Sequence, residues 1–151
     1  MLTSSLHTSL RRGLQLVALT TLAACAGTRP AAFLATTSGP ARPFSPAVRV
    51  NGFLFLSGQV GTDSTGTLVT GGIQPETRQT LENIRAVLQR SGSSMDRVVK
   101  CTVFLADMRE WATMNEVYVT FFAADKRPAR SALGTSGLAL NARVEIECIA
   151  T

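Results

Sequence analysis

The stretch from Pro128 to Cys148, PARSALGTSGLALNARVEIEC, decides the fold and carries the residues from which a function can be argued. It contains two segments of strand-like composition joined by a glycine-containing connection, so we expect them to pair antiparallel. Arg130 lies at the start of the first segment and Glu145 at the start of the second. A guanidinium binds a carboxylate through two parallel hydrogen bonds, and a nearby glutamate can orient and polarise water. The pair suits hydrolysis of a small carboxylate-bearing molecule. The alternative is an ordinary cross-strand salt bridge.

Length and composition indicate one folded domain. The chain has 151 residues, of which 45% are apolar and 17% are charged, and its net charge is +5. These proportions are those of a globular domain with its own core. No cluster of Lys and Arg with interleaved aromatic residues occurs, so we expect no nucleic-acid partner.

Histidine and cysteine are scarce. The only histidine, His7, lies in the N-terminal leader, so the rest of the chain cannot form a Ser-His-Asp or Cys-His arrangement. Cys25, Cys101 and Cys148 are far apart in the sequence and form no CxxC pair. We therefore expect no metal site. Alternation places Cys101 and Cys148 on the apolar sides of their strands, where we expect two buried thiols. A disulfide is the alternative if the two strands are neighbours.

The first 24 residues have the features of an export signal. Arg11 and Arg12 supply positive charge, and Gly13–Leu22 form a short apolar run followed by small residues. The run is too short to span a bilayer permanently. We therefore expect residues 1–24 to be removed as a signal peptide and the rest of the chain to be exported to the periplasm.

The end of this leader resembles the bacterial lipobox. Leu22-Ala23-Ala24-Cys25 places a cysteine where lipoproteins are cleaved and lipidated. The alternative is an ordinary secretory signal. Ala26 follows the cysteine and, by resemblance, points to the outer membrane of a Gram-negative cell, so a lipid anchor is the expected membrane contact. We expect residues 25–39, rich in Ala, Thr, Gly and Pro, to be a flexible tether and residues 40–151 to form the domain.

Within the domain, Asn51-Gly52 between the strand-like runs 47–50 and 53–56 predicts a tight hairpin. The remaining elements should follow in the order strand, helix, strand, helix, strand and strand, at about 67–69, 75–91, 97–105, 109–122, 128–133 and 144–148. This order predicts a mixed sheet with both helices on one face. The opposite face would need a partner, which favours an oligomer.

The second predicted helix carries an aromatic stripe. Trp111, Met114, Tyr118 and Phe121 recur at helical spacing. A stripe of this kind is typical of a helix that packs on a core, and we interpret it in that way rather than as a cofactor site.

The sequence resembles the RidA (reactive intermediate deaminase A, or YjgF) family. The matching stretches are Phe53–Gln59 (FLFLSGQ), Thr77–Asn83 (TRQTLEN), Val98–Asp107 (VVKCTVFLAD), Met114–Tyr118 (MNEVY), Pro128–Ser131 (PARS) and Val144–Glu147 (VEIE). The resemblance runs from about Arg42 to the C-terminus. It implies an α+β, chorismate-mutase-like fold with a mixed six-stranded sheet and two helices on one face. It also implies a homotrimer with clefts between subunits.

The resemblance further implies an activity and a set of site residues. Deaminase members of the family hydrolyse 2-imino and 2-enamino acids to 2-oxo acids and ammonia, and they need no cofactor. By position, Arg130 would clamp the substrate carboxylate and Glu145 would position the attacking water. Ser57, Asn115 and the backbone N–H of Ala132 would complete the substrate site.

Three features depart from the family pattern, and one of them is the segment Gly134–Gly137 (GTSG), which is smaller and more flexible than the usual one. Phe44 stands where the family has a tyrosine, so the aromatic wall is kept and its hydroxyl is lost. The export signal is the third departure, because the best-known activity of the family protects cytoplasmic enzymes. The alternative function is a non-enzymatic trimeric module that binds small carboxylates or a protein partner. Hydrolysis of a different imine or amide is a third possibility.

Overall fold

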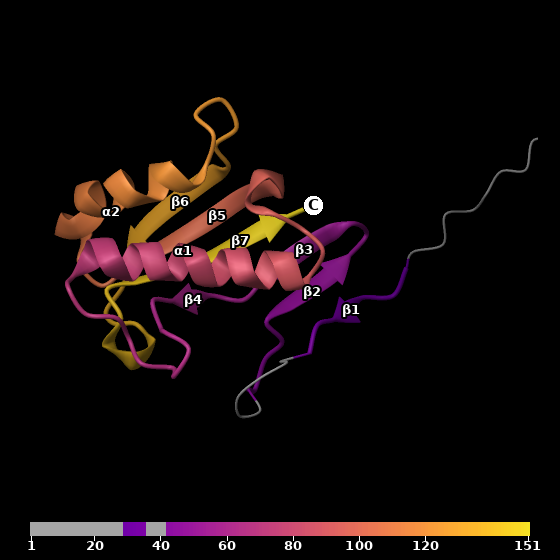
Figure 1. The fold of residues 1–151 in the computed structure, drawn as a ribbon, viewed down its shortest axis with the longest axis horizontal. Helices are drawn as coiled ribbons and strands as arrows, with labels where there is room; N and C mark the ends of the chain where they lie inside the picture. The colour runs from indigo at the N-terminus through magenta and orange to yellow at the C-terminus, as the bar shows by residue number, and fades with distance from the viewer. Residues whose placement is uncertain (1–28, 36–41) are drawn as a thin grey trace, which may run out of the picture.

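The computed structural model describes residues 29–35 and 42–151, which form a mixed sheet with two helices packed against it (Figure 1). The strands are β1 (Ala32–Phe33), β2 (Ala47–Val50), β3 (Phe53–Leu56), β4 (Gln59–Val60), β5 (Val98–Leu105), β6 (Ala129–Gly134) and β7 (Val144–Ala150). The helices are α1 (Ile73–Arg90) and α2 (Trp111–Tyr118). The predicted α+β fold is confirmed, with seven strands where six were expected.

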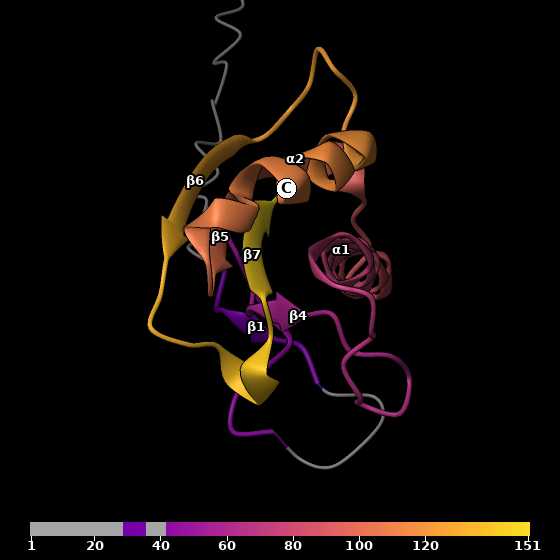
Figure 2. The same ribbon diagram turned by 90° about the vertical axis from the view of Figure 1, so that its left-hand side faces the viewer.

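The helices and the sheet form two layers. In Figure 2, α1 and α2 lie on one side of β5, β6 and β7. Residues that are fully buried alternate along β5 and β7 and face the helices, among them Val103, Leu105, Val144 and Ile146. The core therefore fills the space between the helices and one face of the sheet. The residues between these positions point to the other face.

Two local predictions are confirmed by the backbone. Asn51 and Gly52 form the turn between β2 and β3, with φ of 47° and 86°, as a two-residue hairpin of this type requires. Helix α1 ends where Ser91-Gly92 predicted its end, and Gly92 has a φ of 71°.

Three predicted elements differ in extent. The predicted strand at 67–69 is reduced to a single bridge between Thr62 and Leu68, because Asp63 Oδ1 accepts the backbone N–H of Thr65 and Thr67 and folds the segment into a turn. The helix predicted at 109–122 is α2 flanked by two 3₁₀ turns, Met108–Glu110 and Val119–Phe121. Strand β1 lies inside the predicted tether and pairs with β2.

The predicted leader, Cys25, and residues 25–28 and 36–39 of the predicted tether lie outside the described residues. Within the described part of the chain, no helix combines the length and the hydropathy needed to cross a membrane.

The expected antiparallel pairing of the two C-terminal segments is wrong. Strand β5 lies between them, because β6 pairs with β5 in parallel and β7 pairs with β5 antiparallel. Helix α2 provides the crossover that a parallel β5–β6 pair requires. The connection from β6 to β7 contains a 3₁₀ turn, Ala139–Asn141, and carries the chain past β5 instead of turning back on β6.

The expectation of two free thiols is also wrong. Cys101 on β5 and Cys148 on β7 lie directly opposite each other, and their sulfurs form a disulfide. Both residues are buried on the helix-facing side, as alternation predicted. The sequence did not show that β5 pairs with β7. This pairing places the Cα atoms of Cys101 and Cys148 4.1 Å apart.

Candidate functional site

The predicted site residues fall into two groups on opposite faces of the sheet. Arg130 is in register with the buried Cys101 and reaches toward α2, so it lies on the helix-facing side. Glu145 lies between the buried Val144 and Ile146 on β7 and therefore points to the other face. A single chain does not bring the two side chains together.

Helix α2 holds the side chain of Arg130. Arg130 Nη1 donates a hydrogen bond of 2.6 Å to Asn115 Oδ1. The guanidinium carbon also lies 4.6 Å from the ring centroid of Tyr118 and 5.9 Å from that of Trp111. Positions 111, 115 and 118 share one face of a helix, so three residues of α2 surround the guanidinium on one side.

The charge of Arg130 is not neutralised within the described residues. The ion pairs there join Arg85 to Glu82, Arg109 to Asp107 and Arg143 to Glu110. The neighbours of Arg130 are an amide and two aromatic rings, all of them uncharged. The cross-strand salt bridge with Glu145 is therefore absent from the described chain, and the guanidinium has N–H groups left for an anionic ligand.

Ala132 lies two residues after Arg130 on the same face of β6 and packs partly against the core. Strand β6 is the last strand of the described sheet. One of its edges is therefore unpaired in the described residues, and alternate backbone N–H groups point away from β5. Whether the N–H of Ala132 contacts a carboxylate stays a prediction.

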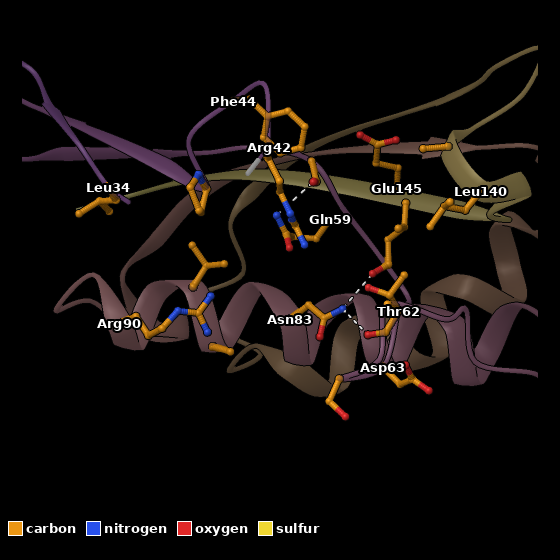
Figure 3. Close-up of a pocket in the computed structure, with 18 of the residues that line it drawn as sticks. Leu34, Arg42, Phe44, Gln59, Thr62, Asp63, Asn83, Arg90, Leu140 and Glu145 are labelled. Carbon is orange, nitrogen blue, oxygen red and sulfur yellow. Dashed lines mark hydrogen bonds between the residues drawn. The ribbon is translucent and has the colours of Figure 1, made fainter. Parts of the chain in front are cut away.

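Glu145 lies at a pocket of about 840 Å³ on the side of the molecule where β4 and α1 approach each other. In Figure 3, Glu145 and Leu140 lie at one end of this pocket, Gln59 and Arg42 near its middle, and Arg90 on α1 at the far end. Phe44 also lines it. The structure therefore brings Phe44 and Glu145, two of the predicted residues, to one cavity.

The pKa of Glu145 is raised above its ordinary value, first by burial and then by the nearby charge of Glu147. Its carboxylate lies against Gly58, where any side chain would overlap it. A partly buried carboxylate with a raised pKa binds a proton more readily than a free one. Glu145 is thus suited to accept a proton from water.

Ser57 has a structural contact in this chain. Its hydroxyl donates to the backbone carbonyl of Ser45 at 2.7 Å, and its backbone N–H donates to the carbonyl of Pro46. These bonds tie the segment that carries Phe44 to the end of β3. The serine therefore positions this segment.

Sequence reasoning missed three contributors. Asn83 on α1 donates to the carbonyls of Val60 and Thr62 and holds β4 beside the helix (Figure 3). Tyr118 and Trp111 belong to the stripe interpreted as core. Tyr118 is indeed buried, whereas 42% of the Trp111 surface is exposed. Their helical spacing with Asn115 was visible in the sequence, but the contact with Arg130 depends on where β6 lies.

The described residues contain no group of three or more His, Cys, Asp and Glu side chains arranged to hold a metal ion.

The chain is similar in sequence to a known protein family. Residues 35–151 match the family described as Endoribonuclease L-PSP. A Mus musculus protein named 2-iminobutanoate/2-iminopropanoate deaminase is 45% identical over 120 residues, which are 78% of this chain and 88% of the mouse protein.

Two solved structures are similar in fold. The crystal structure of RidA from a Psychrobacter species has a TM-score of 0.71 and 35% identity, covering 79% of this chain and 98% of that one. The crystal structure of E. coli TdcF with bound serine has a TM-score of 0.71 and 31% identity, covering 80% of this chain and 98% of that one.

Proposed function

The chain belongs to the Endoribonuclease L-PSP (YjgF/RidA) family, and from that premise we propose that it is a hydrolytic deaminase of reactive 2-imino and 2-enamino acids. Its products would be 2-oxo acids and ammonia. The observation that carries the proposal is the guanidinium of Arg130, which is held by uncharged groups and has no carboxylate partner in the described chain. Such a group is prepared to bind the carboxylate of a substrate. The relatives named as 2-imino acid deaminases support the substrate class.

The proposed reaction uses Arg130 and Glu145 in separate roles. Arg130 grips the substrate carboxylate and so fixes the adjacent C=N carbon. Glu145 accepts a proton from a water molecule as the water oxygen bonds to that carbon, the C=N electron pair moves to the nitrogen, and the nitrogen takes the proton back from Glu145. In the resulting carbinolamine, the hydroxyl proton passes through Glu145 to the amino group, the C–N bond breaks, and ammonia leaves the C=O of the 2-oxo acid. An imine is already electrophilic, so orientation of water and substrate supplies much of the acceleration.

We further propose that the site forms between copies of this chain in a homotrimer. Arg130 and Glu145 lie on opposite faces of the sheet, so one copy would provide the clamp and its neighbour the base. The sheet face away from the helices supports this arrangement. It exposes 46% of Phe53, 45% of Phe55 and 41% of Leu133, and apolar residues gathered on a strand face are typical of an interface.

The test is ammonia release from a freshly generated 2-imino acid. An amino acid oxidase would produce the imine in the presence of a nucleophile that traps free imine as an absorbing adduct. Purified protein of residues 26–151 should lower the yield of the adduct and speed the release of ammonia. An adduct yield that does not depend on the amount of protein would refute the deaminase.

The alternative of a binding module is favoured by two features of the site. Phe44 lacks the hydroxyl that the family tyrosine would bring to the pocket, and Ser57 uses its hydroxyl on Ser45. A pure binder would bind 2-oxobutanoate in calorimetry and leave imine hydrolysis at the uncatalysed rate. Hydrolysis of a different imine or amide would appear as turnover in a substrate panel that excludes 2-imino acids.

We propose that the protein is exported and held to the outer membrane by a lipid on Cys25. The disulfide between Cys101 and Cys148 supports export, because structural disulfides persist mainly in oxidising compartments such as the bacterial periplasm. The leader composition and the lipobox-like stretch are the sequence grounds for the same proposal.

A further inference from the structure

The aromatic ring of Tyr118 has an unusual position for a core residue. Only 3% of its surface is exposed, and it packs against Phe122 with ring centroids 5.0 Å apart. The guanidinium carbon of Arg130 also lies 4.6 Å from the Tyr118 ring centroid. The ring of Tyr118 therefore contacts both the core and the guanidinium of Arg130.

The hydroxyl of Tyr118 does not explain its place. It is buried and has no hydrogen-bond partner in the described structure. An unpaired buried hydroxyl is unfavourable for stability, and phenylalanine would fill the same space without it. Burial raises the pKa of Tyr118 to about 12, and the charge of Arg130 lowers it only in part. The phenol is therefore neutral at physiological pH and forms no ion pair with the guanidinium.

The ring face and Asn115 restrain the guanidinium in complementary ways. The hydrogen bond from Nη1 to Asn115 Oδ1 fixes one nitrogen, and the face of an aromatic ring attracts a cation that lies over it. Together they limit rotation of a side chain that is otherwise flexible. A restrained fork loses less conformational entropy when it binds a carboxylate, so its affinity rises.

We propose that Tyr118 is a positioning residue for the carboxylate clamp, and that its ring, rather than its hydroxyl, holds Arg130 oriented toward the ligand. This inference rests on the proposed function, since it assigns Tyr118 to the same site. Tyr118 would belong to the site but would act on the ligand only through Arg130.

The test compares Tyr118→Leu with Tyr118→Phe and with the control Phe122→Leu. The control removes a neighbouring aromatic ring of the same layer that does not lie over Arg130. Loss of a cation–π contact worth about 0.5–2 kcal/mol corresponds to about 2- to 30-fold in affinity. We expect Tyr118→Leu to weaken 2-oxobutanoate binding and to raise KM by this factor, with a smaller change in kcat. Tyr118→Phe and Phe122→Leu should remain within about twofold of wild type.

Binding can be followed without turnover. Trp111 is the only tryptophan of the chain, and its ring lies 5.9 Å from the guanidinium carbon, so its fluorescence should report occupancy of the clamp. If Tyr118→Phe weakens binding as much as Tyr118→Leu, the hydroxyl is the functional group and the inference is overturned. An equal loss in Phe122→Leu would overturn it as well, since general packing would then explain the effect.

A measurement that needs no ligand separates this inference from the proposed function. In the ¹H–¹⁵N spectrum, the Nε–Hε signal of Arg130 should be shifted by the ring current of Tyr118. The shift should persist in Tyr118→Phe and disappear in Tyr118→Leu or, if that variant does not fold, in Tyr118→Met. An unchanged Arg130 signal in the folded variant refutes the positioning role. A wild-type protein that shows this shift but neither turnover nor 2-oxobutanoate binding refutes the proposed function alone.

Discussion

Two variants that are each strongly impaired alone should recover activity when their subunits mix. Arg130→Lys replaces a planar fork with a point charge that cannot make two parallel hydrogen bonds. Losing one charge-assisted hydrogen bond of about 1.5–3 kcal/mol weakens carboxylate binding by about 10- to 150-fold. Glu145→Gln keeps the size of the side chain and removes the base, which lowers the hydrolysis rate by about 10²- to 10⁴-fold.

The size of the recovery follows from the placement of the two residues. Arg130 faces α2, Glu145 faces away from the helices, and β5 lies between their strands. If each site takes Arg130 from one subunit and Glu145 from the next, a mixed oligomer contains sites with both native residues. Random assembly from equal amounts of the two variants gives about one quarter intact sites, because each of two subunits has the required residue about half of the time.

The assay is imine hydrolysis by variants that are unfolded together, refolded as an equal mixture and compared with each variant refolded alone. Refolded wild type is the control, and sedimentation would establish that all samples have the same oligomeric state. We expect about one quarter of wild-type activity in the mixture. Activity equal to the mean of the separate variants would refute a site shared between subunits, because each chain would then lack one residue of its own site.

The remaining predictions concern stability and export. Burial and Glu147 raise the folded-state pKa of Glu145, so the ionised side chain destabilises the folded state above that pKa. At pH 7, Glu145→Gln should therefore unfold at an equal or higher urea concentration than wild type. At acid pH, where Glu145 is protonated, this difference in stability should disappear. A lower midpoint at pH 7 would indicate a structural ion pair. Replacing Cys101 and Cys148 by Ala removes a crosslink across 47 residues and should lower the free energy of unfolding by about 4 kcal/mol. Detection of two free thiols in the denatured, unreduced wild-type protein would contradict the disulfide. Cys25→Ala should abolish fatty-acid labelling, and a labelled variant or an unlabelled wild type would contradict the lipobox.

Much of the fold could be predicted because its signals are local. The φ > 0 requirement of the Asn51-Gly52 turn and the end of α1 at Ser91-Gly92 depend on adjacent residues only. The alternation along β7 also predicted that Ile146 and Cys148 face the helices and that Glu145 points away from them. Such local patterns predict where helices, strands and turns lie and to which side of the sheet a residue points. They do not predict which strands are neighbours.

The errors have this one cause. Strand order depends on contacts between distant segments, and the insertion of β7 between β3 and β5 leaves no short-range pattern. The sequence therefore favoured a β6–β7 pair and a salt bridge, and it missed that Cys101 lies opposite Cys148. For the same reason Tyr118 could be placed in the core but not beside Arg130.

The strand order also explains how one chain would serve two sites. Cys101 is in register with Arg130 on one side and bonded to Cys148 on the other. Cys148 lies three residues beyond Glu145 on β7. The disulfide therefore fixes the distance between β5, which lies next to the proposed clamp, and β7, which carries the proposed base. If those residues belong to different sites of an oligomer, a disturbance of the β5–β7 pair would change two sites together.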